Sequence, residues 1–229
     1  MPDNQKIVIS LGGSLIIPDE LDLDFLRSFK TLIEAEVKTG KFFIIITGGG
    51  KVCRRYQEVA RELGAGDSES LDWVGIYATR LNATLLRAVF GADAYGEIVV
   101  DPTQTPSVAI PIIVGGGGVP GHSSDFAAVL MAEKTGAKRI VNLSNVDYVY
   151  DKDPRKFPDA EKVERVSWTE FLTIVGDEHR PGINVPFDPM AAKLAKKLGL
   201  EVAIMNGKPL LNLQNYLEGK AFKGTVISS

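Results

Sequence analysis

The chain of 229 residues is 45% hydrophobic and 24% charged, and its formal net charge is −3 at pH 7. This length and apolar content suffice for a sizeable core, in one domain or in two small ones. The slightly acidic balance argues against a general nucleic-acid-binding protein, which usually carries a basic excess.

Cysteine and histidine are both rare in this chain. The single cysteine, Cys53, excludes an internal disulfide and a cysteine zinc cluster. The two histidines, His122 and His179, argue against a histidine metal site. The apolar runs are too short to span a bilayer, and the first residues carry no signal-peptide pattern. We therefore expect a cytoplasmic protein that makes no membrane contact.

Strand-like and helix-like segments alternate along the chain. Apolar strands are predicted at 6–10, 41–47, 110–114, 138–144, 200–206 and 224–228. Helices are predicted at 22–40, 52–64, 71–91, 124–136 and 188–199. Short apolar strands between helices predict an α/β fold, in which a mostly parallel sheet is covered on both faces. The segment 147–187 is richer in proline and charge and is expected to form a semi-separate C-terminal lobe.

Glycine clusters follow three of the predicted strands, at 12–13, 48–50 and 115–118. In parallel sheets, ligands bind beyond the carboxyl ends of the strands. The N–H groups at a helix N-terminus and its partial positive charge suit an anion. We therefore favour anion binding over purely structural turns for these clusters.

The second cluster has cations beside it. Lys51, Arg54 and Arg55 fall within the first two turns of the predicted helix. A solvated basic helix face is one interpretation. The glycines directly upstream favour a phosphate site, with Arg54 supplying a two-pronged donor.

The third cluster formally matches G-x-G-x-x-G through Gly116, Gly118 and Gly121. We discount a dinucleotide fold, because Pro120 stiffens the turn and the match lies far from the first strand. No Walker A loop is present, since no Gly-Lys pair precedes Ser or Thr.

Two further motifs allow two interpretations each. The stretch "PGHSSD" presents Ser123, Ser124 and Asp125 at a helix start, for capping or for ligand binding. The loop "SNVDYVYDKDP" is polar and rich in turn formers, and its tyrosines could stack on a base or simply pack.

Together these segments resemble the amino acid kinase family and, within it, the archaeal-type uridylate (UMP) kinases. The matching pieces are "LGGS", "TGGGKVCRRY", "DWVGIYATRLNA", "GGVPGHSSD", "NVDYVYDKDPRKFPDA" and "FDPMAAKLA". They occur in the order of the family and cover nearly the whole chain.

The resemblance implies the amino acid kinase fold, a three-layer α/β/α sandwich around a mostly parallel sheet. It implies phosphoryl transfer from ATP to UMP, giving ADP and UDP, with Mg²⁺ held mainly by the ATP phosphates. It also implies a single domain over 1–229, with a UMP-binding lobe at about 1–137 and an ATP-binding lobe at about 138–229. A homo-oligomer, typically a hexamer, is the expected assembly.

The same resemblance assigns roles to residues of this chain. Those expected to bind UMP are Gly49, Gly50, Arg54, Asp72, Gly117 and Ser124. Those expected to bind ATP are Gly12, Gly13, Ser14, Asn145, Asp147, Tyr150, Asp153 and Pro154. Lys51, Asp125 and Asp188 are expected to act at the transferred group, with the two carboxylates organising cations and not accepting protons.

Some positions depart from the family pattern. Ser10 stands where many relatives have lysine, and "SSD" replaces the more usual "TTD". Tyr148 stands where the family usually has glycine, so we expect an unusual backbone angle there or a reshaped adenine pocket. The segment 91–110 is short, with little helical pattern. A same-fold kinase with another acceptor and a catalytically weak nucleotide-binding protein remain alternatives.

Overall fold

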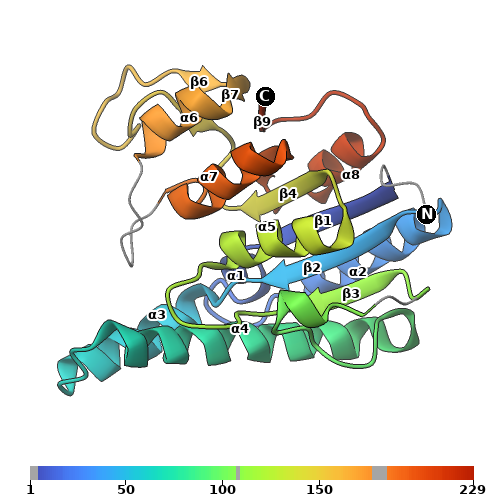
Figure 1. Cartoon of the computed structure of the whole chain (residues 1–229), viewed down its shortest axis with the longest axis horizontal. Coiled ribbons are helices and arrows are strands. Elements are labelled where there is room, and N and C mark those ends of the chain that lie inside the picture. The colour runs from blue at the N-terminus through green and yellow to red at the C-terminus, as the bar shows by residue number, and fades with distance from the viewer. Residues whose placement is uncertain (1–4, 107–108, 177–184) are drawn as a thin grey trace.

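A seven-stranded sheet forms the centre of the computed structural model, which describes residues 5–106, 109–176 and 185–229 (Figure 1). Its strand order is β3-β2-β1-β4-β8-β9-β7, and neighbouring strands are parallel except for β8 and β9. The strands are β1 (Lys6–Leu11), β2 (Phe42–Thr47), β3 (Ile112–Gly115), β4 (Arg139–Ser144), β7 (Arg165–Ser167), β8 (Glu201–Asn206) and β9 (Thr225–Ser228). The predicted mostly parallel sheet is therefore confirmed.

Helices cover both faces of this sheet. They are α1 (Gly13–Ile16), α2 (Leu23–Lys38), α3 (Gly50–Glu62), α4 (Ser68–Phe90), α5 (Ser124–Thr135), α6 (Trp168–Val175), α7 (Pro189–Leu198) and α8 (Leu210–Leu217). The described part of the short segment after α4 contains the 3-10 turns η2 (Gly91–Asp93) and η3 (Pro102–Gln104) and isolated β-bridges at Ala94 and Val99, in keeping with its weak helical pattern. The expectation for 147–187 falls partly outside the described residues; the described part contains the small antiparallel pair β5 (Val149–Tyr150) and β6 (Lys162–Val163).

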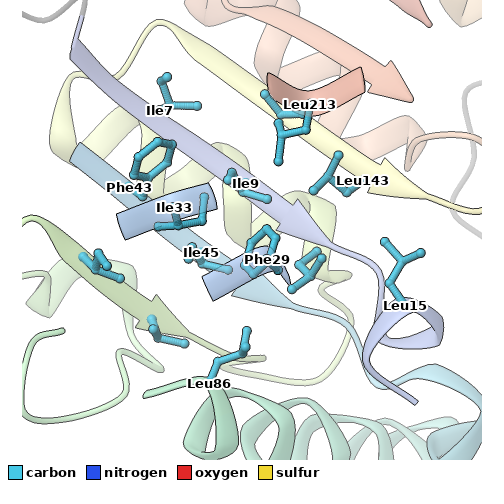
Figure 2. Packing of buried hydrophobic residues seen from close by; sticks show 14 of the residues in the cluster. Ile7, Ile9, Leu15, Phe29, Ile33, Phe43, Ile45, Leu86, Leu143 and Leu213 are labelled. Atoms are coloured by element: carbon cyan, nitrogen blue, oxygen red, sulfur yellow. The ribbon is translucent and has the colours of Figure 1, made fainter. Parts of the chain in front are cut away.

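The core consists of two apolar clusters, one on each face. On one face, Ile7 and Ile9 of β1 pack with residues of α2, α4 and α8, as Figure 2 shows for Phe29, Leu86 and Leu213. The other cluster includes residues of α5, α6 and α7, together with Val8. Because side chains alternate along a strand, Ser10 follows Val8 onto the second face, where α5 begins.

The helix starts follow ordinary capping chemistry. Asp188 precedes Pro189 and accepts a 2.9 Å hydrogen bond from the Ala191 N–H, as the Asp-Pro sequence predicts. α6 and α8 were not expected from the sequence. Ser167 and Glu170 form a capping box at the start of α6, which a search for such pairs could have found.

The helix α3 and the first half of α4 extend past the body of the sheet (Figure 1). α3 contains no buried residue, and it packs mainly on α4. Its N-terminus nevertheless lies at the carboxyl end of β2, so the basic residues of its first turns stand beside the sheet edge. In the part of the chain that the structure describes, no helix is long and apolar enough to cross a membrane.

Candidate active site

The loops that leave the parallel strands form a row along one edge of the sheet. Their order follows the strand order β3-β2-β1-β4, because those strands are parallel neighbours. The row therefore contains the third, the second and the first glycine cluster, followed by the polar loop after β4. We call residues 116–121, which are expected to face UMP, the acceptor loop, and residues 145–161, which are expected to face ATP, the ATP-side loop.

The first two glycine loops touch each other through their backbones. A Cβ atom on Gly13 would lie 2.3 Å from the Gly50 nitrogen and 2.4 Å from the Gly48 oxygen. Gly50 has φ +69°, a conformation that side-chain-bearing residues rarely adopt. Glycine is therefore required at both positions, and residues expected to bind the two nucleotides lie side by side.

The helices after these two loops begin without a side-chain cap. α1 and α3 have Gly12 and Gly49 at the N-cap, and neither start carries a side-chain hydrogen bond. An Asp or Ser side chain caps α2, α4, α5, α6 and α7, whereas α8, which follows Pro209, has no side-chain cap either. The α3 N-terminus thus presents uncapped N–H groups and a partial positive charge that suit a phosphate. The glycine loop before it allows a phosphate to approach the backbone closely.

The basic residues in the first turns of α3 differ in whether they form ion pairs with other residues. The Lys51 ammonium lies 2.8 Å from an Asp19 oxygen, and Arg55 lies 3.4 Å from the same atom. The hydrogen bond from Lys51 is the main cause that lowers the pKa of Asp19. Arg54 is exposed and forms no hydrogen bond or ion pair with any described residue. Arg54 is therefore available to a ligand, whereas Lys51 already uses one of its three donors on Asp19.

Asp125 lies at the centre of a polar cluster under the first loop. Its Oδ1 accepts hydrogen bonds of 2.9 Å from the Ser10 hydroxyl and 2.9 Å from the Asn142 amide. Its Oδ2 accepts a 3.2 Å bond from the Asp188 backbone N–H. Burial raises the pKa of Asp125 to about 6, although the bond from Ser10 acts in the opposite direction.

The register of two strands explains this convergence. Ser10 of β1 and Asn142 of β4 are direct partners in the parallel ladder, so their side chains emerge together on one face. Asp125 and Asp188 approach from the first turn of α5 and the N-cap of α7. Sequence reasoning missed Asn142; a buried polar residue within the apolar stretch "RIVNLS" was the signal.

The acceptor loop is bonded to α4 at its two ends. The Gly117 N–H donates to the Thr79 hydroxyl at 2.7 Å, and the Gly121 N–H donates to Asp72 Oδ2 at 2.8 Å. The Gly117 N–H and one Asp72 oxygen, both expected to face UMP, are thus used inside the protein. Ser124 is the first residue of α5, while Ser123 caps that helix.

The ATP-side loop is bonded mostly to itself. Asp153 accepts a bidentate pair of hydrogen bonds from Arg155 at 3.0 and 3.1 Å, which lowers the pKa of Asp153. Asp147 instead accepts a 2.8 Å bond from Asn206, at the end of β8. Asn145 and Pro154 are exposed, and Tyr150 lies in β5.

The expectation of an unusual backbone angle at Tyr148 was wrong. Within residues 5–106, 109–176 and 185–229, only glycines have positive φ. The Tyr148 ring lies 4.9 Å from the Lys162 ammonium, a cation–π contact across the β5–β6 pair. The alternative expectation, a reshaped adenine pocket, stays a prediction.

A mostly parallel α/β sheet whose glycine loops meet at one edge, beside an uncapped helix N-terminus, the buried Asp188 and the half-buried Asp125, defines a phosphate-handling protein. Residues 5–206 match the amino acid kinase family. The chain belongs to that family.

Archaeal uridylate kinases are among its relatives. The protein of that name from Methanospirillum hungatei is 36% identical, over 97% of this chain and 94% of its own length. The one from Thermoplasma volcanium is 37% identical over 95% of both chains. The crystal structure of uridylate kinase from Archaeoglobus fulgidus superposes with a TM-score of 0.83 at 36% identity, covering 97% of this chain and 100% of that one.

Proposed function

We propose that this chain transfers the terminal phosphoryl group of ATP to UMP, giving ADP and UDP. The near full-length similarity to uridylate kinases supports this reaction. The observation that carries it is the contact between the first two glycine loops. The two loops that we propose to hold the two phosphates lie against each other, which supports the proposal because phosphoryl transfer needs mainly in-line positioning and charge neutralisation.

The strand order supports a division into two lobes. Strands β3, β2 and β1 come from residues 1–137, and strands β4, β8, β9 and β7 come from residues 138–229. We therefore place UMP over the first set and ATP over the second set. The first glycine loop, at the carboxyl end of β1, lies where the two sets meet.

On the UMP side, Gly49, Gly50 and Arg54 are proposed to hold the phosphate. Asp72 keeps one carboxylate oxygen for the ribose hydroxyls while its other oxygen holds the acceptor loop. Ser124 offers its hydroxyl at the end of that loop, and Gly117 contributes through the fixed loop backbone.

On the ATP side, the first glycine loop is proposed to hold the phosphates and the ATP-side loop the nucleoside. The residues of this set are Gly12, Gly13, Ser14, Asn145, Asp147, Tyr150, Asp153 and Pro154. The local hydrogen bonds of Asp153 fit a role in shaping the loop.

Lys51, Asp125 and Asp188 are proposed to act at the transferred group. The phosphate oxygen of UMP is already ionised, so the reaction does not need a general base. Asp125, which is held by three donors, therefore fits a role in organising neighbouring groups. Ser10 belongs to this organising set, because its hydroxyl fixes the Asp125 carboxylate.

The carboxylates of the candidate site fit a Mg²⁺ ion that is held mainly by the ATP phosphates. No group of three or more acidic, histidine or cysteine side chains that could hold a metal occurs in the described part of the chain, and His179 lies outside it. Mg²⁺ usually takes one or two carboxylates together with water and substrate phosphates. Asp125 and Asp188 could supply those carboxylates, and the ion would neutralise phosphate charge.

A homo-oligomer is part of this proposal. Tyr56, Val59 and Leu63 form an exposed apolar stripe along α3, and Tyr77 and Leu81 of α4 are exposed as well. We propose that subunits meet on this surface. The hexameric state and the cytoplasmic location stay predictions.

The test is ADP release from MgATP with UMP, CMP, AMP, GMP and isopentenyl phosphate as separate acceptors. We expect turnover with UMP well above that with the others. Preference for another acceptor would support the same-fold alternative. Binding of ATP and UMP without turnover would exclude both kinase proposals.

A further inference from the structure

Arg80 of α4 lies between the acceptor loop and two aromatic rings. Its Nε donates to the Gly117 oxygen at 3.0 Å, and its Nη2 donates to the Gly118 oxygen at 2.9 Å. The guanidinium carbon lies 5.5 Å from the centre of the Tyr77 ring and 5.9 Å from that of Trp73. The cation–π contacts with the rings and the two directed hydrogen bonds together fix the orientation of this side chain.

These contacts complete a row along α4. Asp72 and Thr79 share one face of the helix, two turns apart, and bond the two ends of the acceptor loop. Arg80, which follows Thr79 in the chain, donates hydrogen bonds to two carbonyl oxygens of the same loop. The loop lies close against the helix, since a Cβ atom on Gly116 would lie 3.2 Å from the Arg80 Cα.

The charge of Arg80 has no carboxylate partner. This half-buried guanidinium forms no ion pair with any residue that the structure describes. Among the described residues, the groups that face this charge are two carbonyl oxygens and two aromatic rings. The packing of α4 on the sheet comes from other residues, Ala83, Leu86 and Phe90. Arg80 therefore binds the acceptor loop and does not belong to the apolar core.

We propose that Arg80 is a positioning residue that fixes the acceptor loop and so sets the affinity for the acceptor nucleotide. This inference rests on the proposed function, because it takes UMP as the acceptor. With the Gly117 and Gly118 carbonyls turned toward α4, the loop backbone is held in one conformation before UMP binds. UMP binding then does not have to order the loop.

The experiment compares Arg80→Met with Arg87→Met. Methionine keeps the apolar stem against the rings but removes both donors. We expect the KM for UMP to rise about tenfold or more, since two charge-assisted hydrogen bonds are lost. The KM for ATP should stay within about twofold, because the ATP-side loop has no contact with Arg80.

Arg87 provides the matched control. It lies two turns further along the same face of α4 and forms no hydrogen bond with the acceptor loop. Arg87→Met should leave both KM values close to wild type. Arg80→Lys keeps the charge but loses the planar fork, so it should recover only part of the UMP affinity. Equal increases in both KM values, or full rescue by lysine, would overturn the proposal.

Amide hydrogen exchange over residues 116–122 gives a second measurement that does not require activity. We expect faster exchange there in Arg80→Met than in the wild type and in Arg87→Met. Unchanged exchange would overturn the role of Arg80 even in an enzyme that is active on UMP. Conversely, a wild type without turnover on any acceptor would refute the proposed function, while the exchange result would still decide the loop's attachment.

Discussion

The acceptor loop and the ATP-side loop are held in opposite ways. The side chains that bond the acceptor loop come from positions 37, 38 and 49 residues away in the chain. In the ATP-side loop, Asp153 and Arg155 are 2 residues apart, and Lys152 and Asp159 are 7 apart. The acceptor loop is therefore fixed mainly by side chains of one helix, α4, together with a 3.2 Å backbone bond from the Gly116 N–H to the Val99 oxygen. The ATP-side loop is fixed mainly by its own turns. A substitution at one loop should therefore change the KM for one substrate and leave the KM for the other substrate nearly unchanged.

The largest effect is expected where the two halves meet. Gly13→Ala places a methyl group 2.3 Å from the Gly50 nitrogen, and both loops consist of backbone that cannot rotate aside. Overpacking of this kind typically costs about 1–3 kcal/mol, and a misplacement of about 1 Å can lower rates about 100-fold. We expect kcat/KM to fall by at least that factor for both substrates, as measured by coupled ADP release.

Gly66→Ala is the matched control for this change. No atom lies within 4 Å of its added Cβ, and its φ is not positive. It should keep wild-type kinetics. A Gly13→Ala enzyme with near-normal rates would show that the contact between the loops is not needed for transfer.

Arg54→Ala should change the KM for UMP and not the KM for ATP. Loss of a charge-assisted bond to the UMP phosphate predicts a rise of about 10- to 100-fold in the KM for UMP. The KM for ATP should change little. Initial rates with each substrate varied in turn give both constants.

Arg61 offers a control on the same helix face, two turns beyond Arg54 and also exposed. Arg61→Ala removes the same charge from α3 at a greater distance from the glycine loop and should have little effect. Equal changes in both KM values for Arg54→Ala would remove Arg54 from the UMP site.

The smallest effect is expected in the ATP-side loop. Arg155→Ala breaks the pair with Asp153, but the pair is exposed, and such pairs contribute about 0–1 kcal/mol. We expect the KM for ATP to rise up to about fivefold, with the KM for UMP unchanged. Arg27→Ala, which breaks an exposed pair on α2, controls for a general surface effect. A rise in the KM for UMP alone would contradict the division into two sides.

The same contrast explains what could be predicted from the sequence. The apolar strands, the glycine loops and the Asp-Pro start of α7 are local signals, and the structure confirms them. The roles of Thr79 and Arg80 depend on residues distant in the chain, so no local pattern could assign them. The polar Asn142 in an apolar strand was a local signal, but its partner Asp125 is 17 residues away and could not be read from that pattern. The expectation of an unusual backbone angle at Tyr148 was wrong, because the φ angle at this position is negative and does not require glycine.

The exposed stripe on α3 has a thermodynamic consequence. The helix buries none of its residues within the subunit, yet its first turns carry Lys51 and Arg54. A second subunit that covers the stripe would stabilise the same helix that is proposed to hold the phosphate. Association and UMP binding are then linked equilibria, in which each strengthens the other by the same factor. The apparent affinity for UMP should therefore rise with enzyme concentration, and UMP should favour the assembled state.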